Sequence, residues 1–302
     1  MNCKQLYSNI LKQPFDNTRY TVWTLFLLLV LIWGSSFILI KNGLEGYTAW
    51  QAATIRLVSA SSVMFFLAIR DIQKVPPQKI LFILLVGTLS MLFPAYLFSI
   101  AETNINSAMA GILNALTPLF TGVFAISFWG QNLSKKQWLG LGIGFFSTSF
   151  LLLFNTDARF TFNEYALLII LATACYGLNI NIVKNYLSDI DPLHVTTIAV
   201  SFAGVMGLIF LFANGYEDYI TVNKSQFYPL LSLIILGVIH TALAQLMQNR
   251  LIQKSSVAFV SSTTYLIPVV AVLIGLLVGE QLVFLHYIGM GGIIFSVWII
   301  KE

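Results

Sequence analysis

Charged residues are scarce in this chain of 302 residues. Asp, Glu, Lys and Arg make up only 9% of it, whereas 58% of it is hydrophobic. A soluble domain of this length could not bury so much apolar surface in one core, because globular domains usually carry about 25% charged residues. The shortage of charge therefore excludes an ordinary soluble enzyme or binding domain and predicts a membrane protein.

Cysteine and histidine are rare, with two and three copies. Cys3 lies near the N-terminus and Cys175 inside an apolar run, so neither a disulfide framework nor a metal site is expected. The sequence also has no HExxH motif, no paired intramembrane aspartates and no Ser–His arrangement with a nucleophile turn. These absences argue against an intramembrane enzyme, and no cofactor is expected.

Long apolar runs are what the chain has instead. A run of about 18 or more apolar residues can cross a bilayer as a helix. The ten runs that we identify leave no room for a soluble domain: 22–40, 49–69, 80–101, 107–128, 138–154, 163–183, 193–213, 227–249, 257–278 and 284–300. The expected fold class is therefore an all-α membrane protein with ten transmembrane helices.

Lys and Arg are unevenly distributed between these runs. With a cytoplasmic N-terminus, twelve of the 16 fall in cytoplasmic segments, three fall outside, and Arg56 lies within a span. The positive-inside rule then predicts a multi-pass protein of the plasma or inner membrane with both termini in the cytoplasm. This asymmetry accounts for the net charge of +4, so the expected surroundings are the lipid bilayer, with no nucleic-acid partner.

An internal repeat organises the chain. The stretch 106–144 recurs at 256–292, with these matches: Ala108 with Ala258, Pro118 with Pro268, Gly130 with Gly279, and Gly140 with Gly289. Upstream, 33–37 (WGSSF) aligns with 176–180 (YGLNI) at an offset of 143. Five spans thus repeat as five, and because five is odd, the second copy must enter the membrane from the opposite side. We expect a tail at 1–20 and inverted repeats at 21–155 and 160–302, with a binding site near the bilayer midplane between them.

Several motifs also occur in a characteristic order: WGSSF with Lys41, Arg56, AETNINSAMAGILNALTPLF at 101–120, and GE-x-L at 279–282 with glycine at 289. This order resembles the EamA-like branch of the drug/metabolite transporter superfamily over nearly all of the chain after the tail. The resemblance implies that spans 1–4 and 6–9 surround a central cavity while spans 5 and 10 are peripheral. It also implies efflux or exchange of small metabolites, amino acids or drugs.

The sequence departs from that pattern in three places. Gln131 stands where the family often has Glu, Ala49 stands where proline is usual, and Arg56 has only Ala199 as its repeat partner. Arg56 is the only charged residue well inside a span, where arginine costs roughly 2.5–3.5 kcal/mol on insertion scales. It is either a counter-ion for an anionic substrate group or a structural residue bound to freed backbone carbonyls.

Span 4 carries a polar stripe that includes Asn114 and Thr117, and in span 9 Thr264 and Tyr265 stand at the matching depth. Pro118 and Pro268 follow as helix breaks, and paired breaks are a pointer to a transport site. The stripe either lines the cavity or joins helices by hydrogen bonds. Trp33 with Ser36, and Tyr176 with Asn179, occupy matching faces of spans 1 and 6. They suit either a pocket wall or helix packing.

Span 8 holds His240 and Gln245. His240 is a candidate for proton coupling, or else a neutral histidine satisfied by a neighbour. Glu102, Glu164 and Glu280 all fall at predicted helix ends, so a carboxylate-based proton relay is not expected. Gly140 and Gly144 in span 5 form a small-residue face with counterparts in span 10, suited to scaffold contacts or to a homodimer.

The sequence therefore predicts an exporter or exchanger of small metabolites, amino acids or drug-like compounds that works by alternating access through a central cavity. An intramembrane enzyme and a non-transporting membrane receptor are the alternatives. The missing catalytic motifs argue against the enzyme, and a receptor would not require two inverted repeats with matched helix breaks.

Overall fold

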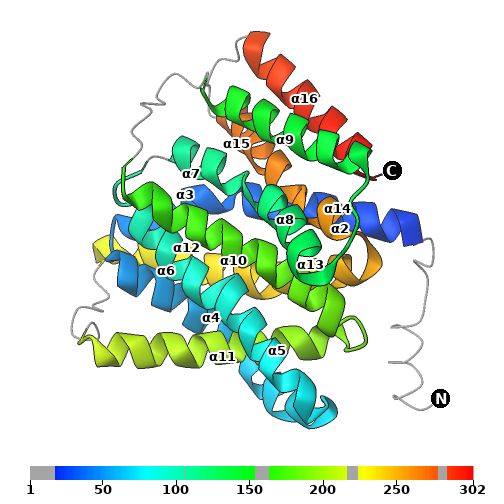
Figure 1. The fold of residues 1–302 in the computed structure, drawn as a ribbon. Helices are drawn as coiled ribbons and strands as arrows, with labels where there is room; N and C mark the ends of the chain where they lie inside the picture. Colours follow the sequence, from blue (N-terminus) through cyan, green and yellow to red (C-terminus); the bar gives the residue numbers. More distant parts are fainter. Residues whose placement is uncertain (1–17, 106, 154–162, 216–223, 278–283, 302) are drawn as a thin grey trace, which may run out of the picture.

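The computed structural model describes residues 18–105, 107–153, 163–215, 224–277 and 284–301, and these form helices joined by short turns (Figure 1). Most of the tail predicted at 1–20 lies outside the described residues, as do Gly279 and Glu280. The first repeat contains α2 (Thr18–Gly34), α3 (Ser36–Leu44), α4 (Ala49–Asp71), η1 (Ile72–Lys74), α5 (Pro77–Gly87), η2 (Thr88–Leu92), α6 (Phe93–Ala101), α7 (Ser107–Asn114), α8 (Thr117–Trp129) and α9 (Lys135–Leu153). The second contains α10 (Tyr165–Tyr186), α11 (Pro192–Ala213), η4 (Lys224–Gln226), α12 (Phe227–Gly237), η5 (Val238–Leu243), α13 (Ala244–Lys254), α14 (Val257–Ser261), α15 (Thr263–Leu277) and α16 (Phe284–Lys301).

The predicted fold class is confirmed. Within the described residues, eight helical segments are long and apolar enough to cross a membrane. The other two predicted spans are α9, which has 19 residues, and the pair α14–α15. A capping box begins α9, because the Ser134 amide donates to Gln137 Oε1 at 2.9 Å and the Gln137 amide donates to Ser134 Oγ at 3.2 Å.

Several spans are interrupted near their middle. Span 1 breaks at Ser35 between α2 and α3, and span 4 breaks between α7 and α8, just before Pro118. Span 9 breaks at Ser262, whereas Pro268 lies inside α15. The predicted break at Pro268 is therefore six residues too late. Proline still has no amide proton there, so the carbonyl one turn earlier, that of Thr264, lacks its usual partner.

Spans 3 and 8 each contain a π-helical segment, η2 and η5 respectively. Gly87 precedes η2 and Gly237 precedes η5, at the repeat offset of 150 residues. A Cβ atom on Gly87 would lie 2.6 Å from the carbonyl oxygen of Ala199, and one on Gly237 would lie 2.4 Å from that of Arg56. Ala199 and Arg56 are themselves repeat partners, so this close packing obeys the pseudo-twofold symmetry.

A second pair of contacts follows the same symmetry. Gly34 of span 1 lies against Val270 of span 9, while Gly177 of span 6 lies against Phe120 of span 4. Both glycines bring backbones closer together than any side chain would allow. The sequence offsets of 143 and 150 residues thus relate equivalent contacts in the structure as well as equivalent residues in the sequence.

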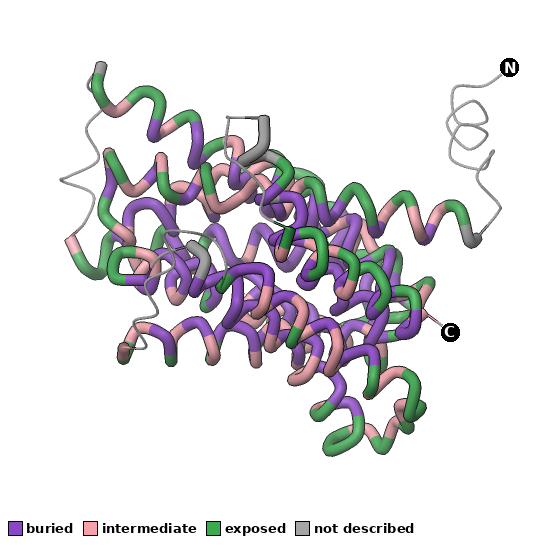
Figure 2. The backbone as a smooth tube through the Cα atoms, turned by 90° about the horizontal axis from the view of Figure 1, so that it is seen from above, coloured by how far each residue is buried: buried purple, intermediate pink, exposed green. Residues whose placement is uncertain are grey.

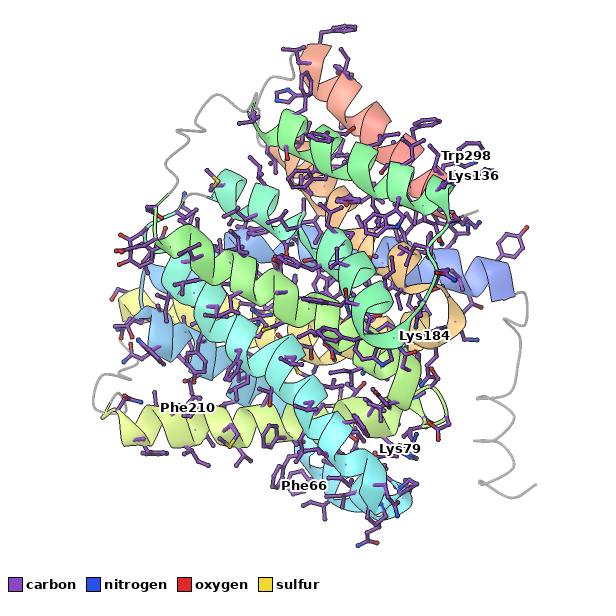
Figure 3. The ribbon with its side chains drawn as sticks, in the orientation of Figure 1. Phe66, Lys79, Lys136, Lys184, Phe210 and Trp298 are labelled. Carbon is purple, nitrogen blue, oxygen red and sulfur yellow. The ribbon has the colours of Figure 1, made fainter. Side chains whose placement is uncertain are left out.

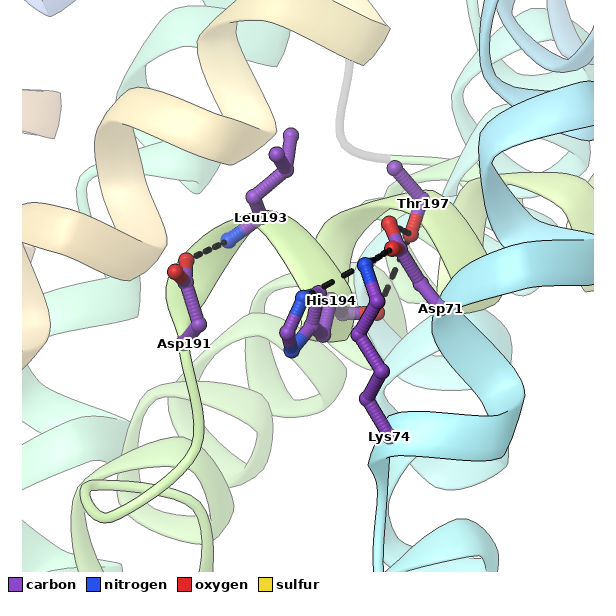
Figure 4. Close-up of polar contacts among 6 residues, drawn as sticks. All are labelled: Asp71, Lys74, Asp191, Leu193, His194 and Thr197. Atoms are coloured by element: carbon purple, nitrogen blue, oxygen red, sulfur yellow. Dashed lines mark hydrogen bonds and ion pairs between the residues drawn. The ribbon is translucent and has the colours of Figure 1, made fainter. Parts of the chain in front are cut away.

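Equivalent helices of the two repeats run antiparallel, as inverted repeats require. Asp71 at the end of α4 accepts a hydrogen bond of 3.0 Å from Thr197 Oγ1 in the second turn of α11, and it also contacts Lys74 and His194 (Figure 4). Gly140 near the start of α9 packs against Ile300 at the end of α16. The predicted small-residue faces of spans 5 and 10 therefore contact each other within one chain.

The helices are arranged as the family resemblance implies. In Figure 1, α9 and α16 lie side by side at the periphery, and the other spans form the main bundle. Buried residues concentrate in the interior of the bundle and exposed ones on its outer surface (Figure 2). Large exposed apolar side chains such as Phe66 and Trp298 point outward (Figure 3), as expected of a surface that faces lipid.

Candidate functional site

A cavity of about 100 Å³ lies between the two repeats. Its walls come from spans 1–4, 6, 8 and 9, so both halves contribute. Nine of the predicted site residues line it: Trp33, Ser36, Arg56, Asn114, Thr117, Tyr176, His240, Gln245 and Thr264. Ser90, Met91 and Thr241, which belong to the two π-helices, also line the cavity.

Arg56 is held in this cavity by a side-chain hydrogen bond to Thr241. Its Nε donates to Thr241 Oγ1 at 2.8 Å, and the Thr241 hydroxyl donates to the Leu236 carbonyl five residues earlier at 3.1 Å. The π-helical turn makes that second bond, and so it aims the hydroxyl oxygen at Arg56. No carboxylate of the described residues lies within ion-pair distance of Arg56, although five N–H donors are present on a guanidinium.

His240 precedes Thr241 in the same π-helix and also lines the cavity. Its Nε2 is 3.1 Å from Ser35 Oγ, and its Nδ1 is 3.4 Å from the Ile235 carbonyl. The indole N–H of Trp33 donates to the backbone carbonyl of His240 at 3.3 Å. His240 thus has protein partners on both ring nitrogens, which fits the interpretation of a neutral histidine satisfied by its neighbours.

Several buried polar atoms near the cavity have no hydrogen-bond partner in the described part of the chain. They include Asn114 Oδ1, Thr117 Oγ1 and both amide atoms of Asn179. An unpaired buried polar group costs about 1–3 kcal/mol, so such groups usually face water or a ligand. Asn114 and Thr117 line the cavity, whereas Asn179 lies beside it, between the lining residues Tyr176 and Ile180.

Tyr265 does not line the cavity, contrary to the prediction. Its side chain is fully buried, and its hydroxyl donates to the Leu141 carbonyl of α9 at 2.8 Å. Its ring packs on Gly144, where a Cβ atom would lie 2.4 Å from the ring carbons. Tyr265 therefore joins span 9 to the peripheral span 5, because the helix break at Ser262 turns this position away from the cavity.

Glu102 lies close to this site, although it is not one of the lining residues, and the sequence analysis missed it. It follows directly after α6, one helical turn beyond the lining residue Phe98, and its Oε1 is buried without a hydrogen-bond partner among the described residues. Burial raises the pKa of Glu102 to about 8, and the positive charge of Arg56 opposes that rise. The signal was the short connection between spans 3 and 4, which cannot carry Glu102 far from the bundle.

At one end of the bundle, polar contacts join span 6 to the end of span 8 within the second repeat, and join the second repeat to the first. Lys184 donates to the carbonyls of Ile252 and Ser255 at 3.0 and 2.9 Å, at the end of span 8. Lys79 of the first repeat bonds to the Tyr186 carbonyl at 2.6 Å and to Asp189 at 3.0 Å. Lys79, Lys136 and Lys184 all lie toward this end in Figure 3, which is the end predicted to be cytoplasmic.

Comparisons with known proteins agree with this arrangement. A family model described as the EamA-like transporter family matches the chain twice, at residues 21–153 and 163–301. An "Uncharacterized inner membrane transporter YedA" of Escherichia coli K12 is 28% identical, over 89% of this chain and 87% of its own. The "Uncharacterized transporter YdfC" of Bacillus subtilis is 25% identical, over 89% of this chain and 88% of its own.

Two further similarities are more distant. A "Probable terminal-alkyne amino-acid exporter" of Streptantibioticus cattleyicolor is 24% identical, over 84% of this chain and 83% of its own. One solved crystal structure superposes with a TM-score of 0.74 over 93% of this chain and 96% of the other, at 13% identity. At that identity the likeness shows a common fold alone.

Proposed function

Because the chain belongs to the EamA-like transporter family, within the drug/metabolite transporter superfamily, we propose that it exports or exchanges small metabolites that carry a carboxylate. The substrate occupies the cavity between the repeats, and Arg56 binds its carboxylate group. The two halves rock against each other, so that the cavity faces one side of the membrane at a time.

The observation that carries this proposal is that Arg56 lines the cavity with no carboxylate of the described residues at ion-pair distance. A guanidinium inside a membrane is costly unless an anion, water or carbonyl groups offset its charge. Thr241 occupies its Nε, and the described residues supply no carboxylate at ion-pair distance. The remaining N–H groups can bind a carboxylate with two parallel hydrogen bonds. The unpartnered oxygens of Asn114 and Thr117 add acceptors for other polar groups of a substrate.

The polar contacts at the Lys184 end support the alternating-access part of the proposal. The Lys79 contacts join the two repeats, and the Lys184 contacts join spans 6 and 8 of the second repeat, as expected of a conformation closed on that side. One of the similar proteins is named as a probable amino-acid exporter, and an amino acid is a small metabolite that carries a carboxylate. A transporter is also the function expected of the family, and no feature of the described residues favours an enzyme or a receptor over it.

Efflux from proteoliposomes tests the proposal. Vesicles containing the purified full-length protein are loaded with a mixture of amino acids, simple carboxylic acids and simple amines, and efflux of each compound is compared with that from protein-free vesicles. We expect protein-dependent efflux of carboxylate-bearing compounds. Protein-independent efflux of every compound would contradict transport altogether.

Substitutions at Arg56 test its role in the same assay. Arg56→Gln should lower efflux of carboxylate-bearing compounds at least tenfold and spare the amines, because it removes the positive charge. Arg56→Lys should also be poor, since an ammonium keeps the charge but loses the planar two-point contact. Equal losses in all charge classes, normalised to protein amount, would make Arg56 a structural residue.

A further inference from the structure

Glu102 brings a second charge to the cavity that Arg56 already serves. It lies on the same helical face as Phe98, one turn further along, and Phe98 stacks on Tyr176 with ring centroids 6.1 Å apart. Phe98, Tyr176 and Arg56 all line the cavity. Glu102 is not one of the lining residues itself, but its position one turn beyond Phe98 places it close to one edge of the cavity.

The charged and titratable neighbours of Glu102 can be named. The segment α6 packs against α4, α10 and η2. Arg56 on α4 and Tyr176 on α10 both interact electrostatically with Glu102, and η2 carries no titratable group. Arg56 is not within ion-pair distance, so the two opposite charges are close enough to influence each other and far enough apart to leave space between them.

The carboxylate is also incompletely satisfied. Its Oε1 is buried and accepts no hydrogen bond from the described residues. An ionised carboxylate in that state is unfavourable unless a cation or a proton reaches it. A small molecule with a positive group at one end and a negative group at the other would satisfy Glu102 and Arg56 together.

We propose that Glu102 is the cation-binding and proton-exchanging group of the cavity, and that the substrate is a zwitterionic α-amino acid. The substrate carboxylate binds Arg56 and its ammonium binds ionised Glu102. A protonated Glu102 cannot accept the ammonium, so a proton and the substrate compete for this one carboxylate. When substrate binds, the proton on Glu102 leaves to the water on the open side of the cavity, and no covalent bond forms or breaks. This inference rests on the proposed transport function and on the role of Arg56.

The pH dependence follows from the raised pKa of Glu102. With a pKa of about 8, the carboxyl is mostly protonated at pH 7 and mostly ionised at pH 9. Amino-acid binding should therefore be about tenfold tighter at pH 9 than at pH 7. The N-acetyl derivative of the same amino acid has no ammonium, so the negative charge of Glu102 only weakens the attraction of Arg56 for it. Its binding should become weaker from pH 7 to pH 9.

The full-length protein is first tested with radiolabelled alanine, leucine and phenylalanine, and the amino acid that binds most tightly is then compared with its N-acetyl derivative. Equilibrium binding of each radiolabelled compound is measured at pH 7 and pH 9, and efflux is measured in parallel. Glu102→Gln should weaken binding of the amino acid at least tenfold at pH 9, and should remove the pH dependence. It should leave the N-acetyl derivative bound at least as tightly as before.

Two controls separate this role from a general loss of structure. Glu164→Gln neutralises an exposed carboxylate at the start of span 6 and should change nothing. Glu102→Asp keeps a carboxylate and should keep the opposite pH trends of the amino acid and its N-acetyl derivative. If Glu102→Gln binds both compounds less tightly, or binds the amino acid like the original protein, the inference is wrong.

The outcomes also separate this inference from the transport function. Efflux of simple carboxylic acids without efflux of amino acids would overturn the zwitterionic substrate and leave transport intact. Binding of amino acids with the expected pH trends, but with no efflux of any compound, would support Glu102 and overturn the proposed transport.

Discussion

At the scale of single residues, Gly237 controls where Arg56 lies. A Cβ atom at this position would come within 2.4 Å of the Arg56 carbonyl oxygen and 2.8 Å of Ser59 Cβ. Gly237→Ala should therefore push α4 and α12 apart, at a cost of about 1–3 kcal/mol. We expect membrane abundance to fall severalfold, with a further loss of efflux per molecule for carboxylate-bearing compounds.

Gly291 supplies the matched control. It lies in the interior of α16, and no atom lies within 4 Å of the Cβ that alanine would add. Gly291→Ala should leave both abundance and efflux unchanged in the same immunoblot and vesicle measurements. If the two substitutions had equal effects, the loss would come from replacing a membrane glycine and not from the contact with Arg56.

At the scale of elements, the π-helix η5 orients the guanidinium. Thr241→Val keeps the shape of the side chain but removes the oxygen that accepts from Arg56 Nε. Hydrogen bonds to charged groups contribute about 1.5–3 kcal/mol, so we expect binding of carboxylate-bearing substrates to weaken about tenfold or more with normal abundance. Thr88→Val in η2 is the control, because the Thr88 hydroxyl donates to Leu84 within its own helix. Equal binding by both variants would contradict the orienting role of η5.

The same elements show how much the sequence could predict. The ten spans and the duplication could be predicted, because apolar runs and matches at a fixed spacing can be read directly from the order of residues. The predicted cavity lining at Arg56, Asn114 and Thr264 agrees with the structure, since polar groups inside a span must face the bundle. The π-helices could not be predicted, because a shift from i−4 to i−5 bonding leaves no clear mark in the sequence. Tyr265 was misplaced because the break at Ser262 precedes the proline that suggested it.

At the scale of the whole molecule, the Lys184 contacts join the end of span 6 to the end of span 8. Lysine at the end of a helix is favourable because it satisfies free carbonyls and the helix dipole. Lys184→Met should therefore shift the protein toward the conformation open at this end. The measurement is maleimide labelling of Gln248→Cys, in a chain that also carries Cys3→Ser and Cys175→Ala, from the predicted cytoplasmic side. We expect labelling to become severalfold faster, and to stay unchanged in the exposed control Lys135→Met.

Lys184 has a counterpart, because the offset of 143 residues relates it to Lys41. The carbonyls of Ile252 and Ser255 correspond, at the offset of 150, to those of Glu102 and Ile105. Lys41 is exposed in this conformation. When the two repeats exchange conformations, Lys41 should donate to the carbonyls at the end of span 3, as Lys184 now donates to those at the end of span 8. Lys41→Met should then slow the labelling that Lys184→Met accelerates, and an unchanged rate would argue against these Lys41 hydrogen bonds. The equilibrium between the inward-open and outward-open conformations would then depend on the relative strength of two sets of lysine–carbonyl hydrogen bonds, one at each side of the membrane.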